Sequence, residues 1–133
     1  MSCIFCRIIK GEIPCIKIAE TAKSLAFMDI APTSKGHALV IPKEHGERLT
    51  DLSDESCADL LPLAKRVAKA TGAENFNILQ NNGRLAHQEV GHVHVHVIPK
   101  PNTEFGLVVG WPSFSISKEE LSELGEQIRS RME

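Results

Sequence analysis

Three histidines alternate with three valines in His92–Val97, the most distinctive pattern in the chain. Alternate residues of a strand point to the same face, so the imidazoles share one face and the valines form the other. Valine suits a half-buried strand, whereas three histidines cost stability unless each finds a partner. The first and third imidazoles are about 13 Å apart at ~3.3 Å per residue, too far to share one metal ion. We therefore expect the three imidazoles to have different tasks.

Nucleotidyl transfer needs such a division of tasks. Imidazole is largely neutral at pH 7, because its ordinary pKa is about 6.5, and it can attack phosphorus as a nucleophile. Water then cleaves the phospho-imidazolium, which divides one difficult step into two. A second imidazole can donate to the phosphate oxygens in the transition state. Two other interpretations of the same strand are a solvated polar face and a metal-handling surface.

A second candidate site lies near the N-terminus, where Cys3–Cys6 forms a C-x-x-C motif. This motif supplies half of a tetrahedral zinc site, and no second C-x-x-C is present, so two further ligands must come from elsewhere. The alternative is a pair of free thiols on a short helix. A thioredoxin-type redox pair is disfavoured because no strand precedes the motif. Cys15 and Cys57 are interpreted as ordinary thiols.

The elements that must position these residues follow from hydrophobic periodicity and turn residues. Five strands are expected, at Ile16–Glu20, Ser24–Asp29, His37–Pro42, Asn75–Gln80 and Val90–Ile98. Helices are expected at Cys3–Lys10, from the cap residue Ser53 to Ala70 with Gly72 as the stop, and at Lys118–Arg131 after the cap residue Ser117. This order predicts an α+β fold, with helices on one face of a mainly antiparallel sheet.

Two of the expected helices have features of their own, a proline inside one and an apolar stripe along the other. Pro62 falls inside the central helix pattern and indicates either a kink or a late helix start. In the last helix, Leu121, Leu124 and Ile128 lie on one face and form an apolar stripe.

Composition narrows the class of protein. The 133 residues predict a single domain, residues 1–133, and 42% hydrophobic residues with a net charge of −2 exclude a disordered chain. The small negative charge argues against binding nucleic acid, and no apolar run is long enough to span a membrane. Four cysteines without a secretory signal predict a reducing compartment, the cytoplasm with the nucleus as a second location. Exposed sheet edges favour pairing of two copies.

The segment His92–Pro99 (HVHVHVIP) resembles the signature of the histidine triad (HIT) family of nucleotide hydrolases and transferases. Asn81–Val90, Asp29–His45 and Trp111-Pro112 also match, and the likeness extends over nearly the whole chain. It is strongest to the adenosine phosphoramidase branch, and within it to fungal members. The resemblance implies a five-stranded, mainly antiparallel sheet with two main helices. It also implies a homodimer with a ten-stranded sheet, in which the Trp111 region reaches toward the partner's site.

The resemblance also implies roles for the polar residues. His94 would be the nucleophile, and His96 would bind the phosphate and assist the leaving group. His92 would orient the site, and His37 would face the phosphate. Asp29 would bind both ribose hydroxyls, and Asn81 and Gln88-Glu89-Val90 would lie at the phosphate. The apolar residues expected around the base are Ile4, Phe5, Ile8, Phe27, Ile30 and Leu39.

Two departures from the family pattern concern the loop before the triad. Glu89 replaces a small hydroxyl residue, so only main-chain N–H groups near Glu89 and Val90 are left to contact the phosphate. We expect its carboxylate to point away, because an anion repels phosphate. His87 stands where the family usually has glycine. Either it lines the phosphate end, or it fills a loop position, which is the interpretation we favour.

The implied activity is hydrolysis of the P–N bond of adenosine 5′-phosphoramidates to AMP and an amine. No catalytic cofactor is expected, on the argument that histidines supply positive charge at the phosphorus. A structural zinc is expected on Cys3, Cys6, His45 and His92. The alternatives are hydrolysis of dinucleoside polyphosphates and a non-catalytic nucleotide-binding or scaffold protein. Transfer to a sugar phosphate is disfavoured, because such transferases carry glutamine where this chain has His96.

Overall fold

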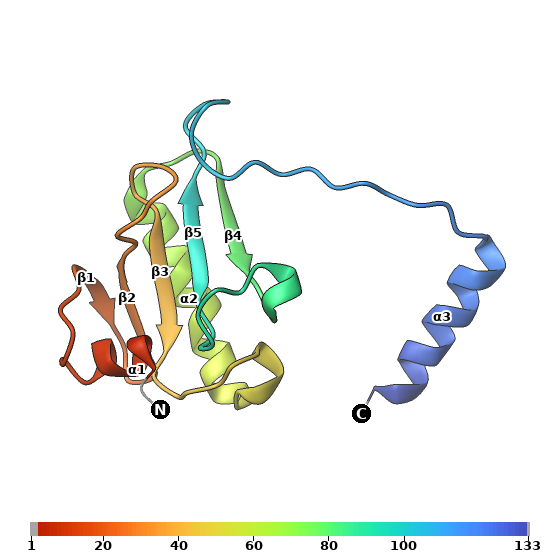
Figure 1. Ribbon diagram of the computed structural model, residues 1–133, viewed down its shortest axis with the longest axis horizontal. Coiled ribbons are helices and arrows are strands. Elements are labelled where there is room, and N and C mark those ends of the chain that lie inside the picture. Colours follow the sequence, from red (N-terminus) through yellow and green to blue (C-terminus); the bar gives the residue numbers. More distant parts are fainter. Residues whose placement is uncertain (1–2, 133) are drawn as a thin grey trace.

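A computed structural model describes residues 3–132 of the chain. The helices are α1 (Ile4–Ile9), α2 (Asp54–Thr71) and α3 (Lys118–Arg131), with single 3₁₀ turns at Leu49–Asp51 and Arg84–Ala86. The strands are β1 (Lys17–Glu20), β2 (Ser24–Met28), β3 (Ala38–Pro42), β4 (Phe76–Gln80) and β5 (Val95–Pro99). They form one five-stranded sheet in the order β1-β2-β3-β5-β4, and every neighbouring pair is antiparallel. Figure 1 shows this sheet with α2 behind it. The α+β prediction is confirmed.

The main core lies between the sheet and α2. The apolar stripe predicted for this helix is confirmed, since Leu60, Leu63, Ala64, Val67 and Ala68 are all buried. They pack against the three valines that alternate with the histidines, Val93, Val95 and Val97, which are at most 4% exposed. The imidazoles are therefore directed to the opposite face of the sheet, where the second and smaller core cluster lies around Phe5, Phe27 and Leu39.

The ends of α2 form where the sequence predicts them. The Ser53 hydroxyl accepts a hydrogen bond from the Ser56 N–H, which satisfies one of the free donors of the first turn. Gly72 ends the helix with a φ of 76°, a left-handed conformation in which glycine carries no Cβ penalty. The helix begins at Asp54 and runs through Pro62, so a late start at this proline is excluded.

The strand expected over Val90–Ile98 is shorter in the structure. It begins at Val95, so His92 and His94 precede it. The Val93 N–H bonds to the Gly46 carbonyl, in a loop beyond β3, and the His92 ring bonds to the Pro42 carbonyl. These contacts hold the segment before β5 against the end of β3 and the loop that follows it. The alternation of buried valines and inward imidazoles survives because the backbone stays extended.

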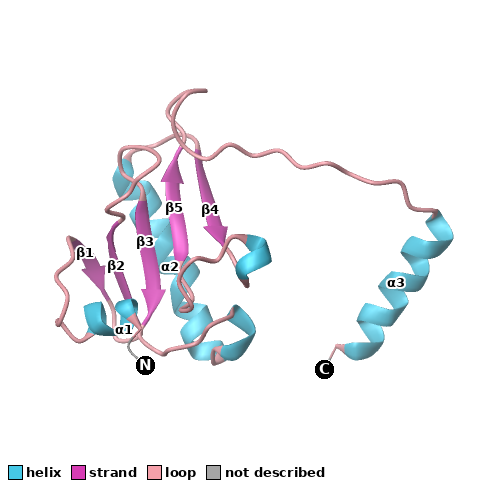
Figure 2. Ribbon diagram, viewed as in Figure 1, coloured by secondary structure: helices cyan, strands magenta, loops and turns pink. Residues whose placement is uncertain are grey.

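The C-terminal part of the chain departs from the rest of the molecule. Residues 107–117, which we call the C-terminal arm, form no helix or strand and run past β4 to α3 (Figure 2). All residues of α3 are exposed, including the apolar stripe of Leu121, Leu124 and Ile128. The predicted helix and its Ser117 cap are confirmed, yet no residue of the helix is buried in the described part of the chain. Over the described residues, no helix has the length and apolar content needed to cross a membrane.

Candidate functional site

A cavity of about 680 Å³ opens on the imidazole face of the sheet, and we call it the main cavity. Its volume lies within the range of small-molecule sites. Its lining combines apolar side chains with titratable groups, a composition suited to a ligand with an apolar ring and an anionic group. The apolar lining includes Ile4, Phe5, Ile8, Phe27, Ile30 and Leu39, and the polar lining includes Asp29, His37, Asn81, His94 and His96.

His94 has its tautomer fixed by the main chain. Its Nδ1 lies 2.8 Å from the carbonyl oxygen of His92. A carbonyl only accepts hydrogen bonds, so Nδ1 must carry the proton, and in the neutral ring Nε2 keeps a lone pair. His94 is 7% exposed and lines the main cavity. This ring is therefore prepared to act as a nucleophile through Nε2.

The tautomers of His37 and His96 are fixed by a main-chain donor, in contrast to the main-chain acceptor that fixes His94. The Thr33 N–H donates to Nδ1 of His37 over 3.2 Å, so neutral His37 carries its proton on Nε2. That Nε2 lies 3.0 Å from Nδ1 of His96, which therefore accepts. The remaining proton of neutral His96 is on its Nε2. His96 thus offers the cavity a donor, the opposite of what His94 offers.

Burial keeps both rings neutral near pH 7. It lowers the pKa of His96 to about 4, with a further lowering from His94 and His37 and an opposing effect of Asp29. Burial also lowers the pKa of His37, again opposed by the Asp29 carboxylate. Burial therefore disfavours the positively charged form of both rings in the ligand-free protein. They act instead as neutral hydrogen-bond donors, oriented by their partners.

Asp29 is divided between two contacts at the end of β2. Its Oδ1 accepts a hydrogen bond from the Ala31 N–H, and its Oδ2 lies 3.4 Å from Nε2 of His37. The first contact fixes the carboxylate in an Asx-type turn, and the second leaves it at the wall of the main cavity. A fixed carboxylate at this position can accept two hydroxyl groups of one ligand.

The loop before the triad contributes unequally to the main cavity. Asn81, Glu89 and Val90 line it, but Gln88 does not. The Gln88 side chain is 4% exposed, accepts from the Gly83 N–H, and donates to the Glu47 carbonyl. Both hydrogen bonds of the Gln88 side chain hold two loops together, so the expected contact of Gln88 with the phosphate stays a prediction and would fall to its main chain.

His87 adopts a backbone conformation that favours glycine, the residue usual at this position in the family pattern. Its φ is 67°, the one positive value among non-glycine residues of the described chain. Glycine enters this left-handed region without strain, whereas other residues pay roughly 1 kcal/mol or more. The His87 carbonyl accepts from Nδ2 of Asn81, and the residue also borders the main cavity. His87 is thus a strained loop residue at the rim of the site.

Sequence reasoning missed the outer wall of the main cavity. Thr33 and the segment Gly106–Val108 line it, and the Gly106 N–H bonds to the Thr33 carbonyl. Gly106 has a φ of 94°, and a Cβ there would lie 2.7 Å from the Pro99 carbonyl oxygen. Only glycine fits at this position, so Gly106 is the one residue type in the segment that could have indicated a close approach of the chain to the cavity wall. Ile13, Pro14 and Cys15 also line the cavity, and nothing in their types pointed to it.

The second expected site is also assembled. We call Cys3, Cys6, His45 and His92 the metal-ligand group, since their ligand atoms all lie within 4.8 Å of one another. Nδ1 of His92 lies 3.4 Å from Sγ of Cys3, 3.7 Å from Sγ of Cys6 and 3.1 Å from Nδ1 of His45. Ligand atoms about 2.0–2.3 Å from a tetrahedral zinc are separated by roughly 3.3–3.8 Å. The spacing fits a single tetrahedral ion.

The tautomers of the histidines distinguish the metal-ligand group from a second cluster, which consists of Asp29, His37 and His96. Nε2 of His92 donates to the Pro42 carbonyl over 2.9 Å, so Nδ1 keeps the lone pair that a metal requires. Asp29, His37 and His96 also lie within 4.8 Å of one another, but His37 carries its proton on the nitrogen that faces the other two. That cluster fits proton donation and not metal binding. His92 does not line the main cavity, so its part in catalysis is limited to positioning.

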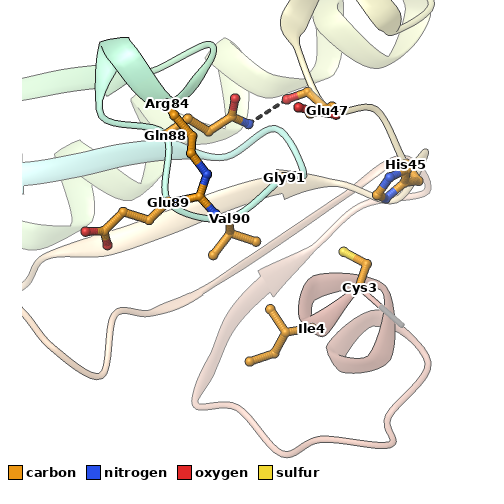
Figure 3. A pocket seen from close by; sticks show the side chains of 9 residues that line it. All are labelled: Cys3, Ile4, His45, Glu47, Arg84, Gln88, Glu89, Val90 and Gly91. Atoms are coloured by element: carbon orange, nitrogen blue, oxygen red, sulfur yellow. Dashed lines mark hydrogen bonds between the residues drawn. The ribbon is translucent and has the colours of Figure 1, made fainter. Parts of the chain in front are cut away.

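A second cavity of about 570 Å³ opens beside the metal-ligand group. Figure 3 shows Cys3 and His45 on one side of it and Arg84 and Glu89 on the other. The dashed line in Figure 3 is the hydrogen bond from Gln88 to Glu47. The metal-ligand group is thus reached from solvent through a space separate from the main cavity, although the two share Ile4, Glu89 and Val90.

Comparison with known proteins places this geometry in a family. Residues 10–103 match the model of the HIT domain, and this range contains the three alternating histidines. The chain belongs to the HIT family. It is 70% identical over 132 residues to an adenosine 5′-monophosphoramidase of Schizosaccharomyces pombe, covering 99% of both chains. It is 52% identical to an adenosine 5′-monophosphoramidase of Saccharomyces cerevisiae, covering 99% of this chain and 84% of that one.

Solved structures of HIT proteins share the fold. A histidine triad nucleotide-binding protein from Candida albicans aligns with a TM-score of 0.92 at 46% identity, covering 97% of this chain and 96% of that one. A HIT family member from Bacillus subtilis aligns with a TM-score of 0.93 at 35% identity, covering 100% and 99%. A score this high over the whole chain requires the C-terminal arm and α3 to lie in similar places.

Proposed function

We propose that this HIT protein hydrolyses the P–N bond of adenosine 5′-phosphoramidates, releasing AMP and an amine. The observation that carries the proposal is the opposite tautomers of His94 and His96 in one cavity, a lone pair on the first and a donor on the second. The fungal relatives named adenosine 5′-monophosphoramidases, which match nearly the full chain, support it. The apolar lining of the main cavity suits a purine, and Asp29 suits a ribose.

The first step forms a covalent intermediate. Nε2 of His94 attacks phosphorus, and the P–N bond breaks as the N–P bond to His94 forms. The leaving nitrogen takes the proton from Nε2 of His96, so it departs as a neutral amine. As this proton leaves, Nδ1 of His96 takes the proton of His37 Nε2, 3.0 Å away, and His37 regains a proton from solvent, so both rings end neutral and Nε2 of His96 is left with a lone pair. Asp29, 3.4 Å from Nε2 of His37, orients that ring during the exchange.

The second step is hydrolysis. Water attacks the phosphorus, gives a proton to the Nε2 lone pair of His96, and displaces His94 with release of AMP, while Nδ1 of His96 returns its proton through His37 to solvent. His92 takes part through its main-chain carbonyl, which keeps the His94 proton on Nδ1 through both steps. His96 is an acid in one step and a base in the next, which a neutral, buried imidazole can perform.

The decisive experiment measures AMP release from adenosine 5′-phosphoramidate by the wild type and His94→Ala. We expect the variant to lose at least about 10³-fold in kcat, because the covalent step is removed, while its affinity for AMP changes less than about tenfold. Full activity in His94→Ala would overturn the mechanism. If the wild type releases no AMP from this substrate but cleaves diadenosine polyphosphates, the protein is a polyphosphate hydrolase. Binding without turnover of either would indicate a binding module.

The proposal includes a structural zinc on the metal-ligand group. Thiolate and imidazole ligands suit zinc, and two cysteines with two histidines complete a tetrahedral set without an open position. Bound there, the ion would hold the N-terminal segment against the loop after β3 and the start of the triad. Metal analysis of protein purified without added metal tests this, and we expect close to one zinc per chain. A content below about 0.2 per chain would contradict it.

The proposal also includes a homodimer. The apolar stripe of α3 is exposed, and the outer edge of β4 carries Phe76 and Ile78, which are 43% and 39% exposed. Exposed sheet edges and apolar faces of this size favour pairing. The placement of the arm and α3, reproduced in the Bacillus subtilis structure, supports a partner that holds them.

Light scattering tests the dimer. Leu121, Leu124 and Ile128 are changed together to glutamine, which preserves helix propensity while removing the apolar stripe. We expect the wild type to have the mass of two chains and the variant to dissociate at least about tenfold more readily. A control variant changes the exposed polar residues Glu119, Glu123 and Gln127 of the same helix to alanine and stays dimeric. A wild type of single-chain mass would contradict this part of the proposal.

A further inference from the structure

The short helix α1 contacts both the metal-ligand group and the main cavity. Its cap residue Cys3 and its third residue Cys6 belong to the metal-ligand group, whereas Ile4, Phe5 and Ile8 line the main cavity. A helix of six residues has little stability of its own, because nucleation is unfavourable and few hydrogen bonds follow it. Its position therefore depends on the contacts that each of its sides makes.

Phe5 is the residue of α1 that joins the two sites. Its ring is 6% exposed and meets the ring of His92 at 5.8 Å and that of His94 at 5.2 Å, both edge to face. It also meets the ring of Phe27 at 5.9 Å, on the wall of the main cavity. One aromatic side chain thus contacts a metal ligand, the nucleophile and the wall of the main cavity at once.

A second connection runs through the main chain. His92 has one ring nitrogen in the metal-ligand group and the other on the Pro42 carbonyl, and its own carbonyl holds Nδ1 of His94. Anything that fixes the His92 ring therefore also restricts the carbonyl that orients the nucleophile. His92 and Phe5 reach His94 from different sides, so the position of His94 depends on both.

We infer that Phe5 is a positioning residue that couples metal binding to nucleotide binding, so that each ligand strengthens the binding of the other. The inference rests on the proposed function for the identity of the nucleotide. Metal on Cys3 and Cys6 fixes the first turn of α1 and with it Phe5, whose ring forms part of the apolar lining of the main cavity. A nucleotide that packs against Phe5 fixes the same turn and holds the two thiolates in place. By linkage, the factor must be equal in the two directions.

The first experiment uses the zinc-loaded protein as purified. Zinc is withdrawn by a competing chromophoric chelator, and the zinc affinity of the protein is determined without AMP and with saturating AMP. We expect AMP to tighten zinc binding about tenfold, within the usual range of couplings between sites. The second cavity, which opens on Cys3 and His45, gives the chelator access. An unchanged zinc affinity would overturn the coupling.

The matching experiment reverses the roles. The affinity for AMP is measured by calorimetry with zinc-loaded and zinc-depleted protein, under reducing conditions, and a loss of about tenfold on depletion is expected. Equal affinities would overturn the coupling and leave the proposed function intact. Absence of AMP binding to the zinc-loaded protein would overturn both. If depleted protein does not fold, the first experiment still decides, because it measures the folded, loaded state.

Phe5→Leu and Phe27→Leu form a matched pair. Both shorten an aromatic wall of the cavity, but among the described residues only Phe5 has ring contacts with His92 and His94. We expect Phe5→Leu to reduce the coupling factor below about twofold, and Phe27→Leu to weaken AMP while keeping the factor near tenfold. A purely structural role for Phe5 would lower both affinities and leave the factor unchanged, which would contradict the inference.

Discussion

Nε2 of His37 lies 3.0 Å from Nδ1 of His96, and the Thr33 N–H determines which of the two donates. The residues are 59 positions apart in the chain, and the pairing of β3 with β5 brings them together. One main-chain amide thereby sets the proton positions of two rings. The donor that His96 presents to the main cavity originates in this contact.

Removal of His37 should therefore weaken the acid at His96 more than it weakens binding. We expect His37→Ala to lower kcat for adenosine 5′-phosphoramidate by about 10²-fold or more, while the affinity for AMP changes less than about tenfold. His37→Gln should retain more activity, because its amide can still donate. Steady-state kinetics and AMP titration check both variants. Additive effects of His37→Ala and His96→Ala on kcat would contradict the shared pathway.

Stability should fall as the pH drops from about 6.5 toward 4. The unfolded chain protonates His96 near its ordinary pKa of about 6.5, but burial lowers its pKa to about 4 in the folded protein. The unfolded state thus binds more protons between these values, so acidification favours unfolding, by up to about 1.4 kcal/mol per pH unit. Urea unfolding at several pH values measures the slope. His96→Gln should lose this part of it, and an identical slope would refute the assignment.

The role of Asp29 can be separated from general folding effects by the substrate. We expect Asp29→Ala to weaken binding of AMP by about tenfold or more, because a charged acceptor of two hydroxyls is lost. It should affect a 2′,3′-dideoxy analogue far less. Competition binding with the two ligands provides the comparison. An equal effect on both would show that Asp29 acts through His37 alone.

Gln88 should contribute to stability and little to binding. Gln88→Ala leaves the Gly83 N–H and the Glu47 carbonyl without this side chain, at a cost of about 1–3 kcal/mol in the free energy of unfolding. Affinity for AMP should stay within about threefold, because the side chain does not line the main cavity. Chemical denaturation measures the change in the free energy of unfolding, and calorimetry measures the affinity for AMP. A large loss of AMP affinity with unchanged stability would reverse the assignment.

The left-handed backbone at His87 predicts different losses of stability for two replacements. In His87→Gly, relief of about 1 kcal/mol of strain is offset by the larger entropy of glycine in the unfolded chain, so the net change is small. His87→Val should lose more than about 1 kcal/mol, because a β-branched residue fits this conformation poorly. Thermal unfolding of both variants, with His87→Asn as a tolerant control, measures this. Equal stability of glycine and valine variants would argue against strain.

Local signals predicted the elements better than the long-range contacts. Ser53 and Gly72 determine the ends of α2 because capping is a property of neighbouring residues. The alternation of valine and histidine predicted the two faces of β5, since period two follows from strand geometry alone. The early start expected for β5 was wrong, because His92 bonds to Pro42 and Val93 to Gly46, contacts that no local pattern reveals.

In the site, too, local signals identified residues, whereas the long-range contacts had to come from the structure. Residue types and the family resemblance led to the histidines, and the structure adds which nitrogen of each carries a proton. That property depends on Thr33, Pro42 and the His92 carbonyl, which are main-chain groups without a sequence signal. The residue type of Gln88 suits a phosphate contact, and only the positions of Gly83 and Glu47 show that its side-chain hydrogen bonds are already used.

The C-terminal arm has a consequence for how long the protein survives in a cell. Residues 108–115 are exposed and have no hydrogen-bonded element, which makes them the stretch a protease would cut first. A single cut there would separate α3 from the sheet and the metal-ligand group. In the proposed dimer a partner covers this stretch and protects it, so dissociation of the dimer would control how quickly the chain is cut.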